Sequence, residues 1–247
     1  MSEPAKTDIA FDFLRQDILA GHFVPDQPLR VADLSGRYGL SATPLREALS
    51  RLAEKRLVVA AANRGWRVAP VSLVEFEDIA RARLAIESAL LADAIACGGL
   101  EWESGIVAAH YRLAQTTAPL GEDDTLENRQ RWIAAHEAFH GALLAAARSA
   151  WLKDFYRQTA EQLQRHHQAV LFHTTAQQDR AAMDTILRTA LSVPRHTRLM
   201  DLALARDEGA ALRELAAHID TTLTIYRRIV ASQQPTTTTT PTERTDA

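Results

Sequence analysis

The chain has little cysteine, glycine or proline, and it has no long apolar run. A single cysteine among 247 residues excludes an intrachain disulfide framework and is typical of a reducing compartment. Residues 1–10 lack the apolar core of a secretion signal, and no run of about 18 apolar residues predicts a membrane span. With 10 glycines, 9 prolines and 47% apolar residues, the composition predicts a well-packed, mostly helical, cytoplasmic protein.

Charge is unevenly distributed along the chain. The net charge of -3 and a pI near 6.3 argue against a protein that coats nucleic acid over its whole surface. Between Arg30 and Pro70, however, eight basic residues stand against three acidic ones, a net of +5, which leaves −8 for the remainder. Any contact with DNA is therefore expected in the N-terminal part.

Residues 41–52 form the most informative stretch, because both ends and both faces of a helix are marked. Ser41 suits the N-cap, and Pro44 suits the first turn, where its missing N–H costs nothing. Apolar residues at i, i+3, i+4 and i+7 form one stripe: Leu45, Ala48, Leu49 and Leu52. The pattern predicts a helix with one packed face and one polar face that can contact DNA.

The first 70 residues predict a winged helix-turn-helix. Its expected elements are helices at 7–20, 31–38 and 41–55, a turn at 25–28, and two short strands at 57–60 and 66–69. Gly39 supplies the turn between the second and third helices, and the segment 61–65 contains Asn and Gly, which allow a positive φ. Two strands after the third helix would form the wing.

From Ser72 onward strand patterns stop and helical periodicity continues to residue 232. We expect helices at 72–97, 101–117, 123–148, 150–172, 177–192, 194–206 and 208–232. The domains are therefore placed at 1–70 and 71–232, followed by a disordered tail at 233–247 that contains five consecutive threonines. The fold class is mainly α: an N-terminal winged helix-turn-helix and a C-terminal all-α helical bundle.

Residues 38–52, Tyr-Gly-Leu-Ser-Ala-Thr-Pro-Leu-Arg-Glu-Ala-Leu-Ser-Arg-Leu, together with Leu34 and the wing, resemble the N-terminal domain of GntR-type transcription regulators. The helical remainder resembles the FCD ligand-binding domain of the FadR branch. The two resemblances cover about residues 7–232. They imply a homodimer that binds a palindromic operator in double-stranded DNA and responds to a small carboxylate effector in the helical domain. Repression is favoured over activation, because a dimer on a promoter blocks access without further machinery.

Arg46 is the first candidate for reading bases. An arginine in the second turn of a recognition helix can contact guanine bidentately or clamp a phosphate. The family often has a second base-reading arginine four residues earlier, where this chain has Ala42, so no operator sequence can be transferred. The residues expected to position the domain on DNA are Arg30, Ser41, Thr43, Arg51, Asn63, Arg64 and Gly65. Each also fits an ordinary role as a cap or surface charge, and Arg51 fits both interpretations equally.

Four of the nine histidines have the spacing of a metal site. His136 and His140 are one turn apart on a helix face, which suits chelation of one ion. With His196 and His218 they match the register of the FCD metal site, in which aspartate usually replaces His136. An all-imidazole site favours Zn²⁺, or Ni²⁺, over Mn²⁺ and Mg²⁺. Alternatively, His136 does not ligate, and three histidines leave positions open for water and the effector carboxylate. The other histidines are assigned ordinary core or surface roles: His22, His110, His166, His167 and His173.

An effector acid needs a cation in the bundle. Arg83, with Glu87 one turn later, lies where the resembling family commonly has an arginine facing the pocket, and Arg165 is a second candidate. The alternative is that Arg83 and Glu87 form an ordinary surface pair on a helix.

Two other classes of function remain open from the sequence. The segment His136-Glu137-Ala138-Phe139-His140 is a literal H-E-x-x-H, the motif of zinc metallopeptidases, although this interpretation explains neither the winged helix nor the later histidines. A DNA-binding architectural protein without an effector is the other alternative. It would not need the histidines, and the helical part is longer than a dimerisation device requires.

Overall fold

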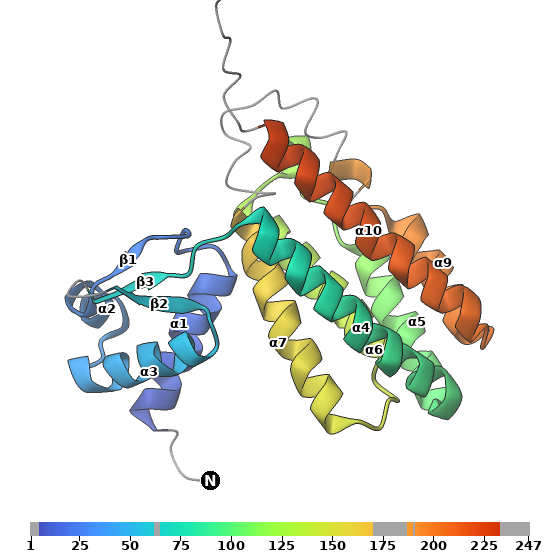
Figure 1. Ribbon diagram of the computed structural model, residues 1–247, viewed down its shortest axis with the longest axis horizontal. Coiled ribbons are helices and arrows are strands. Elements are labelled where there is room, and N and C mark those ends of the chain that lie inside the picture. Colours follow the sequence, from blue (N-terminus) through green and yellow to red (C-terminus); the bar gives the residue numbers. More distant parts are fainter. Residues whose placement is uncertain (1–4, 62–64, 170–186, 190, 233–247) are drawn as a thin grey trace, which may run out of the picture.

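The computed structural model describes residues 5–61, 65–169, 187–189 and 191–232, which form the two bodies in Figure 1. A small winged-helix body lies beside a bundle of long helices, and each has its own hydrophobic core. The expectation of a mainly α protein, with a winged helix-turn-helix followed by an all-α bundle, is confirmed.

Three helices and a three-stranded antiparallel sheet make up the winged-helix body. The elements are α1 (Lys6–Leu19), β1 (Pro28–Leu29), α2 (Val31–Tyr38), α3 (Ala42–Glu54), β2 (Val58–Ala61) and β3 (Gly65–Val68), with strand order β1-β3-β2. The sequence did not indicate β1, which begins where the predicted turn ends. This strand is only two residues long, and it exists because Pro28 and Leu29 pair with Arg67 and Trp66 of β3.

The apolar stripe of α3 packs entirely inward. Leu45, Ala48, Leu49 and Leu52 are all 0% exposed, in a core shared with α1 and α2. Gly39, with φ 66°, ends α2 in the left-handed conformation and lets the chain turn into α3. Burying each leucine contributes roughly 1.5–3 kcal/mol, so this stripe determines which face of α3 remains outward.

The bundle consists of long helices whose ends lie near the predicted positions. They are α4 (Leu73–Cys97), α5 (Leu100–Gln115), α6 (Leu126–Leu143), α7 (Ala150–His167), α9 (Val193–Leu204) and α10 (Glu208–Ser232), with a 3-10 turn η1 (Gly121–Asp123). The predicted helix at 123–148 is shorter in the structure. It starts later because the Thr125 hydroxyl caps α6 by accepting from the backbone N–H of Asn128, and it ends at Leu143. The prediction for 177–192 lies largely outside the described residues, and that for 233–247 lies wholly outside them. Among the described helices, none is both long and apolar enough to cross a bilayer.

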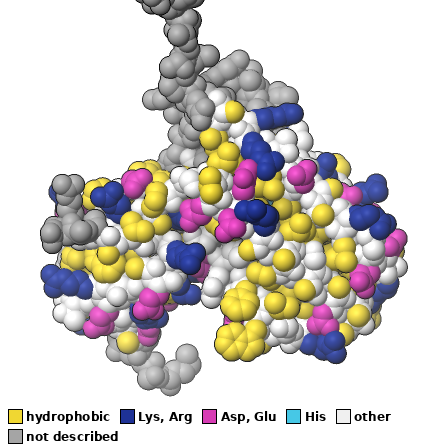
Figure 2. All heavy atoms as spheres, viewed as in Figure 1, with side chains coloured by type: hydrophobic (Ala, Val, Ile, Leu, Met, Phe, Trp, Pro, Cys, Tyr) yellow, Lys and Arg dark blue, Asp and Glu magenta, His cyan; other side chains and the backbone are white. Residues whose placement is uncertain are grey.

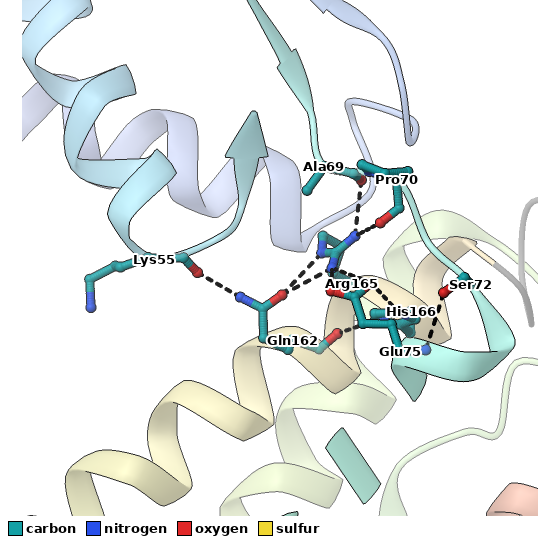
Figure 3. Close-up of polar contacts among 8 residues, drawn as sticks. All are labelled: Lys55, Ala69, Pro70, Ser72, Glu75, Gln162, Arg165 and His166. Atoms are coloured by element: carbon teal, nitrogen blue, oxygen red, sulfur yellow. Dashed lines mark hydrogen bonds and ion pairs between the residues drawn. The ribbon is translucent and has the colours of Figure 1, made fainter. Parts of the chain in front are cut away.

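Helix α7 fastens the two bodies together. Figure 3 shows Gln162 Nε2 donating to the carbonyl of Lys55, at the end of α3, over 2.7 Å. Arg165 Nη1 donates to the carbonyls of Ala69 and Pro70 in the connecting loop, over 2.9 Å to Ala69. Side chains of α7 therefore hold both the recognition helix and the linker.

Candidate functional site

The outward face of α3 presents polar groups at its N-terminal end. Thr43 and Arg46 are exposed, and the Arg46 guanidinium makes no hydrogen bond or ion pair with any residue the structure describes. Ser41 occupies the N-cap position as predicted, but its hydroxyl makes no capping bond. Arg30 is exposed at the start of α2. These four side chains are therefore accessible to a ligand approaching α3.

Arg51 has local partners instead. Its Nη1 lies 2.7 Å from Asp8 Oδ1, and its guanidinium carbon lies 4.5 Å from the centroid of the Phe11 ring. Both partners belong to α1, so Arg51 ties α3 to α1. This geometry favours the packing interpretation of Arg51 over a DNA contact.

Only one of the three predicted wing-tip residues lies in the described part of the chain. Gly65 begins β3, is exposed and has φ 80°, a left-handed conformation that side chains other than glycine rarely adopt. The predictions for Asn63 and Arg64 fall outside the described residues.

In the bundle, three helices bring the four predicted histidines together. His136 and His140 come from α6, His196 from α9 and His218 from α10, and each offers a ring nitrogen within 4.8 Å of the others. An ion with bonds of about 2.1 Å joins nitrogens up to about 4.2 Å apart, so small side-chain movements would complete a site. The spacing inferred from the sequence therefore corresponds to proximity in space.

Two buried ring nitrogens of this cluster lack partners in the described part of the chain. The Nε2 atoms of His140 and His196 make no hydrogen bond there, although both residues are almost fully buried. His196 Nδ1 lies 2.8 Å from the carbonyl oxygen of Ser192, so Nδ1–H donates there and Nε2 keeps a lone pair. A buried acceptor of this kind is costly unless it binds something, and metal-binding histidines are oriented in this way. The donor set fits a metal ion.

The protonation states of these histidines also suit a metal ion. Burial, together with the neighbouring His140, lowers the pKa of His136 to about 4. Burial likewise lowers the pKa of His196 to about 2 and that of His218 well below its usual range. These rings are neutral at pH 7, the form that metal ions bind.

Beside the histidines, Arg83 lies in a buried network of charges. Arg83 is 4% exposed and Glu87 1%, and Arg83 Nε donates to Glu87 Oε1. Arg83 Nη1 lies 3.5 Å from Glu137 Oε1, and Glu87 Oε2 lies 3.6 Å from His140 Nδ1. The alternative of a surface pair is therefore wrong, because both partners are inside the bundle. No sequence pattern indicated Glu137 as the second partner of Arg83.

Arg83 and three of the four cluster histidines line one small cavity, whose empty space is about 380 Å³ when the part open to solvent is included. Its polar wall contains Arg83, three of the four cluster histidines, His167 and Thr222. The rest of the lining is apolar and consists of Phe76, Ala80, Leu163, Ile219 and Leu223. A small amphiphilic molecule with one polar end suits such a cavity.

Arg165 does not line this cavity. Its guanidinium donates to the carbonyls of Ala69 and Pro70 and pairs with Glu75 at 3.4 Å. The expectation that Arg165 binds the effector is therefore not supported, because docking of the winged helix takes up its hydrogen bonds. His167, two residues later, was assigned an ordinary role but faces the cavity.

Glu137 of the H-E-x-x-H motif points into the charge network. Besides the contact with Arg83, its Oε1 lies 3.3 Å from His136 Nδ1, and the Tyr156 hydroxyl lies 3.5 Å from Oε2. Arg83 and His136 lower the pKa of this carboxyl despite its burial. A carboxylate held in ion pairs does not have the properties of a general base for water.

The fold and the site define a class: a winged-helix DNA-binding protein with a ligand-binding helical bundle. Residues 7–68 match the family described as bacterial regulatory proteins, gntR family, and residues 78–221 match the FCD domain. The chain belongs to the GntR family and carries an FCD domain. It is a DNA-binding transcription regulator and not an enzyme.

Relatives support the same assignment over nearly the whole chain. The chain is 35% identical over 228 residues to the HTH-type transcriptional repressor GlaR of Escherichia coli, covering 90% of this chain and 96% of GlaR. It is 32% identical over 222 residues to the HTH-type transcriptional regulator BphR of Paraburkholderia xenovorans, covering 90% and 85%. The solved structure of McbR/YncC from E. coli has the same fold, with a TM-score of 0.70 at 20% identity over 92% of this chain and 99% of that one.

Proposed function

We propose that this regulator is a cytoplasmic repressor that binds a palindromic operator as a homodimer. Its operator affinity changes when a small organic acid occupies the bundle beside a bound metal ion. The observation that carries the proposal is the shared cavity of the histidine cluster and buried Arg83. The name of GlaR as a repressor supports repression.

The metal would be held by His136, His140, His196 and His218. Four imidazoles without a carboxylate favour Zn²⁺, with Ni²⁺ as the second choice. When bound, the ion supplies positive charge and Lewis acidity at the polar end of the cavity. Arg83 would donate to the acid from the same side through Nη2, because its contacts with Glu87 and Glu137 use Nε and Nη1.

On the DNA side, Arg46 would read a base pair, since it is exposed and has no partner among the described residues. Arg30, Ser41 and Thr43 would contact phosphates around the N-terminus of α3. Asn63, Arg64 and Gly65 would place the wing against the minor groove.

The proposal is tested with purified full-length protein and DNA from upstream of its own gene. Fluorescence anisotropy should show specific, salt-dependent binding, and light scattering should give twice the chain mass. Adding small acids to the zinc-loaded protein should change operator affinity. Specific binding that no acid alters would instead support an architectural DNA-binding protein.

Helix α7 contacts both the cavity and the winged-helix body. Its Leu163 and His167 line the cavity, whereas Gln164 Nε2 donates to the carbonyl of Leu19 over 3.1 Å. Glu161 pairs with Arg15 of α1 at 2.7 Å. Since one rigid helix contacts both the cavity and α1, a ligand that shifts α7 also shifts the recognition helices. Acid binding and operator binding would then be reciprocally coupled.

Replacing Arg165 with methionine should therefore weaken this coupling. The change leaves the carbonyls of Ala69 and Pro70 without their donor, at a cost of about 1–3 kcal/mol each where they stay buried. We expect the melting temperature to fall by several degrees and the acid-induced change in operator affinity to shrink about fivefold or more. Anisotropy titrations with and without acid measure this change.

Arg157→Met is the matched control, because this α7 arginine is exposed and, among the described residues, pairs with Asp154 alone. Gln162→Leu is a second variant, which removes the bond to Lys55 and the two bonds that Gln162 Oε1 accepts from Arg165. An unchanged acid response in both Arg165→Met and Gln162→Leu would show that α7 does not carry the signal.

A further inference from the structure

The described part of the cavity wall contains one cationic side chain, Arg83, and two carboxylates already pair with it. Glu87 accepts from Arg83 Nε and Glu137 Oε1 lies 3.5 Å from Nη1. The Arg83 guanidinium carbon also lies 5.5 Å from the centroid of the Tyr156 ring. Arg83 can still donate a hydrogen bond to a ligand, but it adds no uncompensated positive charge.

The charge balance of the site follows from these pairs. A divalent ion on four neutral imidazoles adds two positive charges, Arg83 adds one, and the carboxylates of Glu87 and Glu137 remove two. The loaded site thus has one excess positive charge. One bound carboxylate makes it neutral, whereas a dicarboxylate would leave one negative charge in a cavity whose remaining lining is apolar. Burying an uncompensated charge is strongly unfavourable.

His167 offers a different kind of contact. It lies on α7 and lines the cavity, and its buried Nε2 has no hydrogen-bond partner among the residues that the structure describes. Its ring packs edge-on against Phe76, with ring centroids 5.7 Å apart, and Phe76 stacks on Tyr226 at 3.8 Å. The ring is therefore held in place by aromatic packing, and its unpaired nitrogen is available to a ligand.

In the described part of the wall, Thr222 is the one polar residue besides the histidines and Arg83, and it is already bonded. Its hydroxyl donates to the backbone carbonyl of His218 over 3.3 Å. A ligand can therefore satisfy the buried His167 Nε2 only by bringing its own hydrogen-bonding group, since buried polar atoms are rarely left unpaired.

We infer that His167 is a specificity-determining residue, and that the effector is a small monocarboxylate carrying an uncharged hydrogen-bonding group, such as a hydroxyl or keto oxygen, that bonds to His167 Nε2. Dicarboxylates and unsubstituted acids of the same length bind more weakly. This inference rests on the proposed function, because it assumes that the cavity holds an acid beside a metal ion.

Isothermal titration calorimetry of the zinc-loaded full-length protein tests the inference. The probes are two matched sets: propionate, lactate and malonate, and then butyrate, 3-hydroxybutyrate, 4-hydroxybutyrate and succinate. We expect at least one hydroxy acid to bind about tenfold or more tightly than both its unsubstituted and its dicarboxylate counterpart.

Variants distinguish a hydrogen bond to His167 from chelation of the metal by the hydroxyl group of the acid. His167→Leu should bring the ratio of hydroxy acid to plain acid affinity close to one, and His167→Gln, which keeps a polar group near the Nε2 position, should restore part of it. His110→Leu is the control, because His110 lies on α5 outside the lining of the cavity, and it should leave the ratio unchanged. Zinc content, measured by mass spectrometry, should remain the same in all three variants.

The possible failures are distinguishable. Tightest binding of a dicarboxylate, or an unchanged ratio in His167→Leu, overturns the inference and leaves the proposed function intact. If His167→Leu does not fold, His167→Asn serves instead, because its shorter amide cannot reach the Nε2 position and should also lose the ratio. No binding of any probe, while zinc and operator still bind, would overturn both the inference and the proposed acid response.

Discussion

Replacing His140 and His196 together with alanine is expected to abolish stoichiometric metal binding and, with it, the response of operator binding to acids. These two residues carry the buried Nε2 atoms that have no partner, and they come from different helices, α6 and α9. Two remaining imidazoles cannot form the closed or nearly closed coordination that holds zinc tightly. Mass spectrometry of the purified protein should find about one metal ion per wild-type chain and none per double-variant chain.

Stability gives an independent readout of the same change. An ion that binds only the folded state stabilises it by mass action, about 2.7 kcal/mol at a hundredfold excess over Kd. Zinc should therefore raise the melting temperature of the wild type but not that of the double variant. Nickel should act similarly, whereas magnesium should have little effect on either, since imidazole ligands suit zinc and nickel.

His110→Ala is the matched control for the histidine variants. His110 lies on α5 outside the cluster, and its Nε2 is 2.9 Å from the Thr197 hydroxyl, so its removal should leave the metal content unchanged. A wild-type protein that is empty after gentle purification and shows no melting shift with any of these metals would contradict the metal assignment.

The parts of the fold that were predictable depend on local patterns. The stripe of Leu45, Leu49 and Leu52 repeats at helical spacing, so α3 and its inward face could be inferred without knowing its partners. Strand β1 could not be inferred, because two residues carry no periodicity and Leu29 is a strand residue only through its pairing with Trp66. Tertiary pairing, not propensity, decides such short elements.

The candidate site shows the same division. The spacing of His136 and His140 indicates chelation within one helix, but only the resemblance to the FCD domain connected these two with His196 and His218. His167 had no local signal, since a lone histidine on a helix is usually an ordinary core residue. Its role depends on how α7 packs against Phe76 of α4, which the sequence does not state.

The sequence could not show that Arg165 contacts the linker and not the effector, for a related reason. An arginine on a bundle helix suits an anionic ligand equally well as a domain contact, and its destination depends on how the winged helix docks. Once the carbonyls of Ala69 and Pro70 face α7, they need a buried donor, and Arg165 is within reach. The charge on Arg165 thus stabilises the connection between the domains.

Replacing Arg46 with alanine should weaken operator binding by about 1 to 3 kcal/mol, roughly fivefold to 150-fold, without unfolding the protein. Arg46 is exposed and unpaired among the described residues, so its removal breaks no internal contact. Anisotropy on the operator and on single-base variants measures the effect. A base-reading role predicts that the loss is concentrated at one base pair, where Arg46→Ala relaxes discrimination.

Arg51→Ala separates base readout from a general loss of positive charge. Arg51 is on the same helix and also partly exposed, but it pairs with Asp8 and covers Phe11, so its loss should lower stability by less than about 1 kcal/mol and change affinity little. Equal weakening by both variants, uniform across base changes and with a lower salt slope, would identify Arg46 as a phosphate contact. Unchanged affinity in Arg46→Ala would remove it from the interface. Specificity would then depend on the wing and on the spacing of the two recognition helices, because Ala42 has no side chain that could replace Arg46.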